Sequence, residues 1–216
     1  MEINWMIPRS FVDYPSEISC VLGFRNCNLN CNFCSNWRVV NQDYKKITLD
    51  HIRQIFETDP IITATTLTGG EPSTDIPLMR KIIRLAKDNN LKVSVQTNGL
   101  LLSEIADLDI DLFQIDLKLF LSKEIISSII KTAISMIDDD RLKFTVVLFD
   151  NFPREKLKLI CNQLVHIEGI IGIPQLARKS EQRRLKPLEK SSLAKFKRCI
   201  DLRPYDYDGL EISHFD

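Results

Sequence analysis

Apolar and polar positions follow two alternating patterns along the chain, and together these predict a regular succession of strands and helices. Short runs rich in β-branched residues, typical of strands, are separated by amphipathic segments with helical spacing. We expect strands at 18–24, 62–68, 91–97, 112–118, 142–149 and 169–177, and helices at 49–57, 76–89, 101–108, 123–137, 154–165 and 188–200. This alternation of strands and helices indicates a single α/β domain with a parallel sheet.

The number of strand–helix units limits the architecture. A complete eight-unit barrel takes about 250 residues, whereas this chain has 216, so a partial barrel and an open doubly wound sheet both fit. In 91–98, Val93 and Val95 alternate with Ser94 and Gln96, although parallel strands covered on both faces are usually apolar throughout. We therefore expect the apolar faces to meet the helices and the polar faces to line a cavity for a polar molecule.

The two ends of the chain lie outside this alternation. Residues 1–17 contain Pro8 and Pro15 and are expected to form an irregular N-terminal cap segment. The α/β core is expected to span 18–200, and residues 201–216 are expected to form a C-terminal tail.

Composition argues against several kinds of partner. Lys+Arg and Asp+Glu both number 29, so no net charge favours nucleic acid or an anionic membrane. The apolar runs are too short to cross a bilayer, and the first ten residues lack the basic flank and apolar stretch of a secretory signal. A chain of this size needs no disulfides for stability, although it has six cysteines. We expect a cytoplasmic protein that binds neither nucleic acid nor membrane.

Three of the cysteines lie close together, in the run Cys-Asn-Leu-Asn-Cys-Asn-Phe-Cys that places Cys27, Cys31 and Cys34. Thiolates at this spacing can converge on one soft metal centre. A closed zinc site or an electron-carrying 4Fe–4S cluster normally has four protein ligands, but the next cysteine is Cys161. Three thiolates would leave one iron open, and an open metal position is where chemistry can occur. The alternative is a zinc site completed by His51 or another donor.

A second motif, Gly69-Gly70-Glu71-Pro72, follows the expected strand 62–68. Glycine permits positive φ and close approach to a backbone, which suits a turn that contacts a ligand. The alternative is an ordinary turn between a strand and a helix.

Together the two motifs resemble the radical S-adenosylmethionine (SAM) superfamily, whose cysteine signature is matched by Cys27, Cys31, Phe33 and Cys34. The resemblance implies a partial (βα)6 barrel with outer helices, a 4Fe–4S cluster on the three cysteines, and SAM at the open iron. Reductive cleavage of SAM would give a 5′-deoxyadenosyl radical that takes hydrogen from a substrate. The turn at 69–71 would contact the methionine amino group. A non-catalytic metal-binding scaffold is the alternative from another class.

Three further segments resemble the small activating enzymes of glycyl-radical proteins, especially the anaerobic ribonucleoside-triphosphate reductase activating type. They are Val-Asp-Tyr-Pro at 12–15, Thr-Asn-Gly at 97–99 and Asp-Leu-Lys at 116–118. Ser16 stands where the first segment usually has glycine. The resemblance implies that Asn98, Asp116 and Lys118 lie near the ribose and the methionine carboxylate of SAM; for any single one, a solvated strand end is the alternative.

The function implied by this resemblance is abstraction of an α-hydrogen from a backbone glycine of a partner glycyl-radical enzyme. The electron would come from flavodoxin or ferredoxin. Little chain remains outside the core for an elaborate small-molecule pocket, and no second cysteine cluster is present. A radical enzyme that acts on a small molecule, in the manner of 7-carboxy-7-deazaguanine synthase, is the alternative.

Overall fold

A computed structural model describes residues 3–31, 34, 36, 46–148, 153–164, 170–174 and 200–202. The chain divides into two compact units. The first consists of residues Met1–Ile115 and Thr132–Leu142, and the second of Asp116–Lys131 and Lys143–Asp216.

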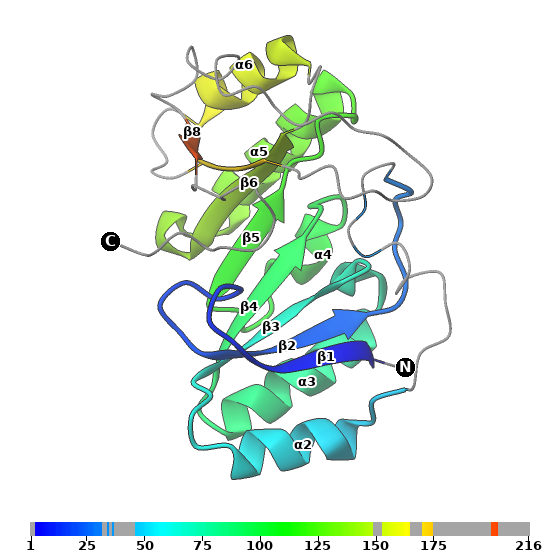
Figure 1. Ribbon diagram of the computed structural model, residues 1–216. Coiled ribbons are helices and arrows are strands. Elements are labelled where there is room, and N and C mark those ends of the chain that lie inside the picture. The colour runs from blue at the N-terminus through cyan, green and yellow to red at the C-terminus, as the bar shows by residue number, and fades with distance from the viewer. Residues whose placement is uncertain are drawn as a thin grey trace. The chain divides into compact units, whose positions relative to one another are not determined.

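Within the described residues, five strands form the sheet of the first unit (Figure 1). They are β1 (Ile3–Ser10), β2 (Ser19–Phe24), β3 (Ala64–Gly69), β4 (Lys92–Thr97) and β5 (Leu112–Asp116, whose last residue belongs to the second unit). Strands β2 to β5 are parallel, and β1 is antiparallel to β2. The segments that follow β2, β3 and β4 therefore start from the same end of the sheet, which we call the carboxyl edge.

The helices of the first unit are α2 (Leu49–Thr58), α3 (Ile76–Asp88) and the short α4 (Leu102–Ile105). Helix α3 is capped by Asp75, whose side chain accepts a hydrogen bond from the backbone N–H of Leu78. Its apolar face is buried, and α3 contacts β3 and β4. One face of these strands carries apolar side chains that are fully buried, namely Leu67, Val93, Val95, Phe113 and Ile115. The apolar strand faces thus form the core, as the alternation predicted.

The second unit contains β6 (Leu142–Leu148, whose first residue belongs to the first unit), α6 (Arg154–Gln163), β7 (Ile170–Pro174) and β8 (Ile200–Leu202). Strand β6 pairs with β7 and β7 pairs with β8, and both pairs are parallel. Helix α5 (Lys123–Met136) begins in this unit and ends in the first. The α/β architecture, with parallel strands and helices between them, confirms the expected fold class.

Two expectations about the ends of the chain were wrong. Residues 3–10 form strand β1 instead of an irregular cap, and Gly23 explains how β1 packs, because a Cβ there would come within 2.1 Å of the Trp5 ring. Ile200, expected as the last residue of a helix, begins β8. The rest of that helix and most of the tail lie outside the described residues. No described helix is long and apolar enough to cross a membrane.

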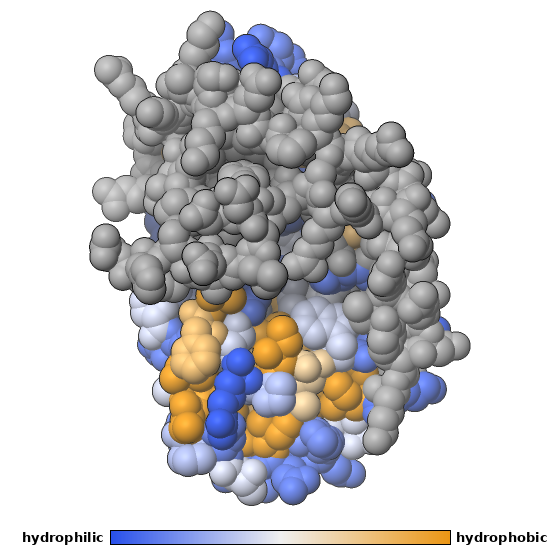
Figure 2. Space-filling model, viewed as in Figure 1, coloured by the Kyte–Doolittle hydropathy of each residue, from blue (hydrophilic) through white to orange (hydrophobic). Residues whose placement is uncertain are grey.

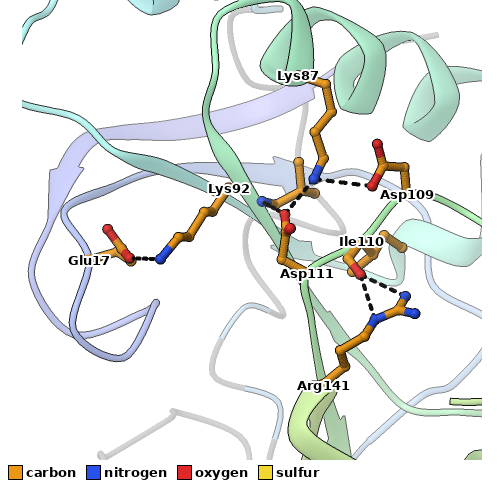
Figure 3. Close-up of polar contacts among 8 residues, drawn as sticks. Glu17, Lys87, Lys92, Asp109, Ile110, Asp111 and Arg141 are labelled. Carbon is orange, nitrogen blue, oxygen red and sulfur yellow. Dashed lines mark hydrogen bonds and ion pairs between the residues drawn. The ribbon is translucent and has the colours of Figure 1, made fainter. Parts of the chain in front are cut away.

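Polar contacts join the elements at the amino ends of β4 and β5 (Figure 3). The Asp111 carboxylate accepts hydrogen bonds from Lys87 Nζ and from the Val93 backbone N–H, both at 2.7 Å. The Arg141 guanidinium donates two hydrogen bonds to the Ile110 carbonyl, at 3.1 and 2.7 Å. Lys92 and Glu17 form a further ion pair in this region. These contacts lie at the end of the strands opposite the carboxyl edge.

Replacing Arg141 by alanine is expected to lower the free energy of unfolding by about 1–3 kcal/mol, because the guanidinium also lies over the Phe113 ring, 5.5 Å from its centroid. Urea unfolding of the apo-protein would measure this loss, with the exposed helix residue Arg53→Ala as the matched control. A midpoint equal to that of the control would contradict the stabilising role of Arg141.

Candidate functional site

The segment after β2 and the turn after β3 are joined by their backbones at the carboxyl edge. The Gly70 N–H donates to the Phe24 carbonyl at 2.8 Å, and the Glu71 N–H donates to the Asn26 carbonyl at 2.6 Å. Beyond the cysteines, the Asn36 side-chain amide donates to the Gly69 carbonyl at 3.2 Å. The loop that carries the cysteines is therefore attached to the Gly-Gly-Glu turn on both sides.

Both glycines of this turn are required by that attachment. Gly69 has a φ of 107°, and a Cβ there would lie 2.5 Å from the Phe24 backbone nitrogen. A Cβ at Gly70 would lie 2.1 Å from the Asn26 carbonyl oxygen. The close backbone approach that glycine permits is used here by the protein's own chain.

Glu71 is almost completely buried, with 1% of its surface exposed, and both of its carboxylate oxygens are used. Oε1 accepts hydrogen bonds from the Ser73 N–H at 3.2 Å, the Ser73 hydroxyl at 2.6 Å and the Thr97 hydroxyl at 2.7 Å. Oε2 accepts from the Asn98 N–H at 2.7 Å. The Glu71 side chain thus ties the turn after β3 to the turn after β4, and any contact of this turn with a ligand falls to its backbone.

Asn98 connects the turn after β4 to the cysteine loop. Its side-chain amide donates to the side-chain oxygen of Asn28 at 2.7 Å, and its own oxygen accepts from the Leu100 N–H at 3.0 Å. Asn98 is 5% exposed. The structure therefore brings together the cysteine loop, residues 69–71 and Asn98.

The three cysteines are partly buried residues of one loop. The Cys34 N–H donates to the Cys31 carbonyl at 3.2 Å, and Cys27 Sγ accepts a hydrogen bond from the Leu29 N–H at 3.5 Å. No three His, Cys, Asp or Glu side chains among the described residues are arranged as a set of metal ligands. The structure thus places the thiols on one anchored loop without bringing them into ligating geometry, and Phe33 lies outside the described residues.

The chemistry of this donor set fits an iron–sulfur cluster. Three thiols on a loop of eight residues would supply soft ligands for three irons of such a cluster and would leave the fourth open. A fourth ligand from Cys20 is excluded, because that side chain is fully buried in the core. Burial raises the pKa of the Cys20 thiol to about 12, and the charge of Asp59 adds to this shift. Cys20 therefore stays a protonated thiol.

Asp116 and Lys118 are neighbours in the second unit. Lys118 Nζ forms an ion pair with Asp116 Oδ2 at 2.5 Å, and both side chains are largely buried. The other carboxylate oxygen, Asp116 Oδ1, is buried and has no hydrogen-bond partner among the residues that the structure describes. A buried acceptor without a partner costs about 1–3 kcal/mol, which fits a residue that receives a donor from a ligand.

Sequence reasoning missed several polar residues around this site. Besides Asn28 and Asn36, a network covers the polar face of the sheet: the Thr68 hydroxyl donates to Gln96 Oε1 at 2.7 Å, and Gln96 Nε2 donates to Asp13 Oδ1 at 3.4 Å. The alternation in β4 predicted a polar face. It gave no signal that this face would be engaged by the loop between β1 and β2.

Comparison with known proteins identifies the class. Residues 21–143, more than half of the chain, match the Radical SAM superfamily. The chain belongs to this superfamily, whose members use a 4Fe–4S cluster and S-adenosylmethionine.

Several curated relatives match a little under half of the chain, and two of them have names that bear on function. The first, from Methanocaldococcus jannaschii, has the provisional name glycyl-radical enzyme activating enzyme MJ1227; it is 28% identical over 98 residues, which are 45% of this chain and 40% of the relative. The second, 7-carboxy-7-deazaguanine synthase from Clostridium acetobutylicum, is 31% identical over 106 residues, 45% of this chain and 47% of the relative. The chain thus spans less than half the length of each.

The fold also resembles a solved structure. TYW1 with a lysine-pyruvate adduct bound superposes with a TM-score of 0.52 at 18% identity, over 82% of this chain and 70% of that one. The similarity supports the partial-barrel fold and carries no information about the substrate.

Proposed function

We propose that this protein activates a glycyl-radical enzyme by taking a hydrogen atom from a backbone glycine of that partner. The sequence at 12–15 resembles the N-terminal segment of such activating enzymes. The observation that carries the proposal is where this segment lies in the structure. One of the curated relatives described above is named as such an enzyme.

The segment is integrated into the polar face of the sheet. The Ser10 hydroxyl donates to Asp13 Oδ2 at 2.5 Å, and Gln114 Nε2 donates to the Asp13 carbonyl at 2.7 Å. Tyr14 is 7% exposed and forms an apolar cluster with Ala64 and Leu112. Burial, with smaller contributions from nearby carboxylates, raises the pKa of the Tyr14 phenol to about 12, so it stays neutral. These hydrogen bonds and the burial of Tyr14 fix the segment on the polar face of the sheet. This position supports a role of the segment in binding the substrate.

The same segment offers apolar surface to a protein partner. Phe11 and Val12, directly before Asp13, are 70% and 52% exposed, and Ile7 of β1 is 42% exposed. Figure 2 shows hydrophobic side chains gathered on the face that carries β1 and the β1–β2 loop. Exposed apolar patches are typical of protein-binding surfaces.

In this proposal Cys27, Cys31 and Cys34 hold the cluster, and Phe33 is the aromatic residue of the same motif. The backbone at 69–71 receives the methionine amino group of SAM, since an amino group needs acceptors and carbonyl oxygens provide them. Asn98, Asp116 and Lys118 would orient the ribose and the methionine carboxylate. This role suits the cationic Lys118 and Asp116 Oδ1, which has no partner among the described residues.

When bound, the cluster and SAM would supply one electron and a 5′-deoxyadenosyl group. For each turnover, one electron and one SAM would give methionine, 5′-deoxyadenosine and one glycyl radical on the partner. Flavodoxin or ferredoxin is the expected source of the electron, because the chain contains no second cysteine cluster to store one.

The test is radical transfer under anaerobic conditions. The reconstituted protein, reduced flavodoxin, SAM and a candidate glycyl-radical enzyme are combined, and the electron paramagnetic resonance (EPR) spectrum is recorded. We expect the doublet of a glycyl radical, with one 5′-deoxyadenosine per radical, and neither product with Cys31→Ala. Formation of 7-carboxy-7-deazaguanine from the substrate of that synthase, with no glycyl radical, would contradict the proposal and favour the small-molecule alternative, to which the second relative points. A scaffold would form no 5′-deoxyadenosine.

A further inference from the structure

One side chain of the cysteine loop forms a hydrogen bond to another element, and neither sequence motif assigns it a role. Asn28 follows Cys27 directly, and its Oδ1 accepts a hydrogen bond from the side-chain amide of Asn98 at 2.7 Å. The two residues are 70 positions apart in the chain. The contact therefore joins the first cysteine to the turn after β4.

The direction of this hydrogen bond is fixed by the surroundings of Asn98. Because Asn98 Oδ1 accepts from the Leu100 N–H, the NH2 group of the same amide must face Asn28. The Asn98 backbone N–H is held by the buried carboxylate of Glu71. Asn98 is thus held at two atoms independently of Asn28, and what it requires from Asn28 is an acceptor.

Asn28 also lies at a bend of the chain between Cys27 and Leu29. The Leu29 N–H donates to Cys27 Sγ at 3.5 Å, so the residues on either side of Asn28 contact each other. A change in the orientation of Asn28 changes the direction in which the Cys27 thiol points. Holding Asn28 by its side chain therefore orients Cys27.

The difference in burial separates this role from general stability. Glu71 and Asn98 are buried, with 1% and 5% of their surfaces exposed, whereas Asn28 is exposed. Water can replace an exposed partner at small cost to folding. Loss of the Asn28 acceptor is expected to release the loop more than it destabilises the protein.

We propose that Asn28 is a positioning residue that orients the Cys27 thiol by accepting the hydrogen bond from Asn98. The inference rests on the cluster site of the proposed function and is independent of the substrate. Residues that support metal ligands typically contribute 10–100-fold to metal affinity or activity.

The first test uses the apo-protein, so it needs no cluster. The rate at which iodoacetamide alkylates Cys27 is measured by peptide mass spectrometry for Asn28→Ala, Asn28→Asp and Asn30→Ala. Asn28→Asp retains an acceptor, and Asn30 is an exposed asparagine of the same loop. We expect a several-fold change in the Cys27 rate for Asn28→Ala alone, with an unchanged urea midpoint. A Cys27 rate in Asn28→Ala equal to that in Asn30→Ala, or a rate that Asn28→Asp changes as much, would overturn the inference.

The second test uses the reconstituted protein. For Asn28→Ala we expect a roughly tenfold higher KM for SAM in 5′-deoxyadenosine formation without a partner, and a smaller SAM-induced change in the EPR spectrum. An unchanged KM and spectrum would contradict the role of Asn28 at the cluster. Failure of the proposed function is a different result, because the wild-type protein itself would then form no 5′-deoxyadenosine or no glycyl radical.

Discussion

Gly70→Ala is expected to abolish SAM cleavage and to lower the free energy of unfolding of the apo-protein by about 3 kcal/mol. The new Cβ would lie 2.1 Å from the Asn26 carbonyl oxygen, and overpacking of this kind costs about 1–3 kcal/mol. The neighbouring backbone can move away only by breaking the hydrogen bonds from Gly70 to Phe24 and from Glu71 to Asn26, each worth about 1 kcal/mol. The same movement would displace the start of the cysteine loop.

Urea unfolding and iron content after reconstitution measure these two effects. Gly99→Ala is the control, since Gly99 lies outside the contact with Asn26 and an alanine there is disfavoured by its positive φ of 79°. Its backbone strain is worth about 1–2 kcal/mol. If Gly70→Ala bound a full cluster and were no less stable than Gly99→Ala, the close approach of the turn to the cysteine loop would be refuted.

Glu71→Gln is expected to cost about 2–4 kcal/mol and to reduce 5′-deoxyadenosine formation at least tenfold. The carboxylate accepts four hydrogen bonds from three residues, whereas a glutamine has one acceptor oxygen. If that oxygen occupies the position of Oε1, its NH2 group meets the Asn98 N–H, and two buried donors then face each other. Each buried donor left without a partner costs about 1–3 kcal/mol, and the turn after β4 would shift.

The control for this variant is Glu57→Gln, at an exposed position of α2. The unfolding midpoint and the yield of 5′-deoxyadenosine are compared for the two variants. A Glu71→Gln protein as stable and as active as the control would mean that Glu71 does not hold the two turns together.

The fold could be predicted from the sequence wherever a strand has one apolar and one polar face. Val93 and Val95, fully buried beside α3, and the polar Ser94 and Gln96 on the other face illustrate this agreement. The pattern failed at the two outermost strands. β1 is an antiparallel strand that includes Pro8, and β8 has three residues, too few to establish a period of two.

The candidate site could be predicted only in part. Sequence motifs mark the candidate ligand residues, but they do not mark the residues that hold these in position. The spacing of Cys27, Cys31 and Cys34 and the glycines at 69–70 indicated a shared site. The burial of Glu71 and its hydrogen bonds were not predictable, since its donors lie up to 27 positions away. The contact between Asn28 and Asn98 depends in the same way on strands pairing over long sequence distances, and an asparagine in a loop carries no such signal by itself.

The central claim is that three thiolates on one loop hold a cluster whose remaining iron binds SAM. The most direct measurement is the EPR spectrum of the anaerobically reconstituted, reduced protein with and without SAM, followed by assay for 5′-deoxyadenosine. We predict a 4Fe–4S signal that changes when SAM is added, together with formation of 5′-deoxyadenosine. A cluster whose spectrum is indifferent to SAM, with no 5′-deoxyadenosine formed, would contradict the account.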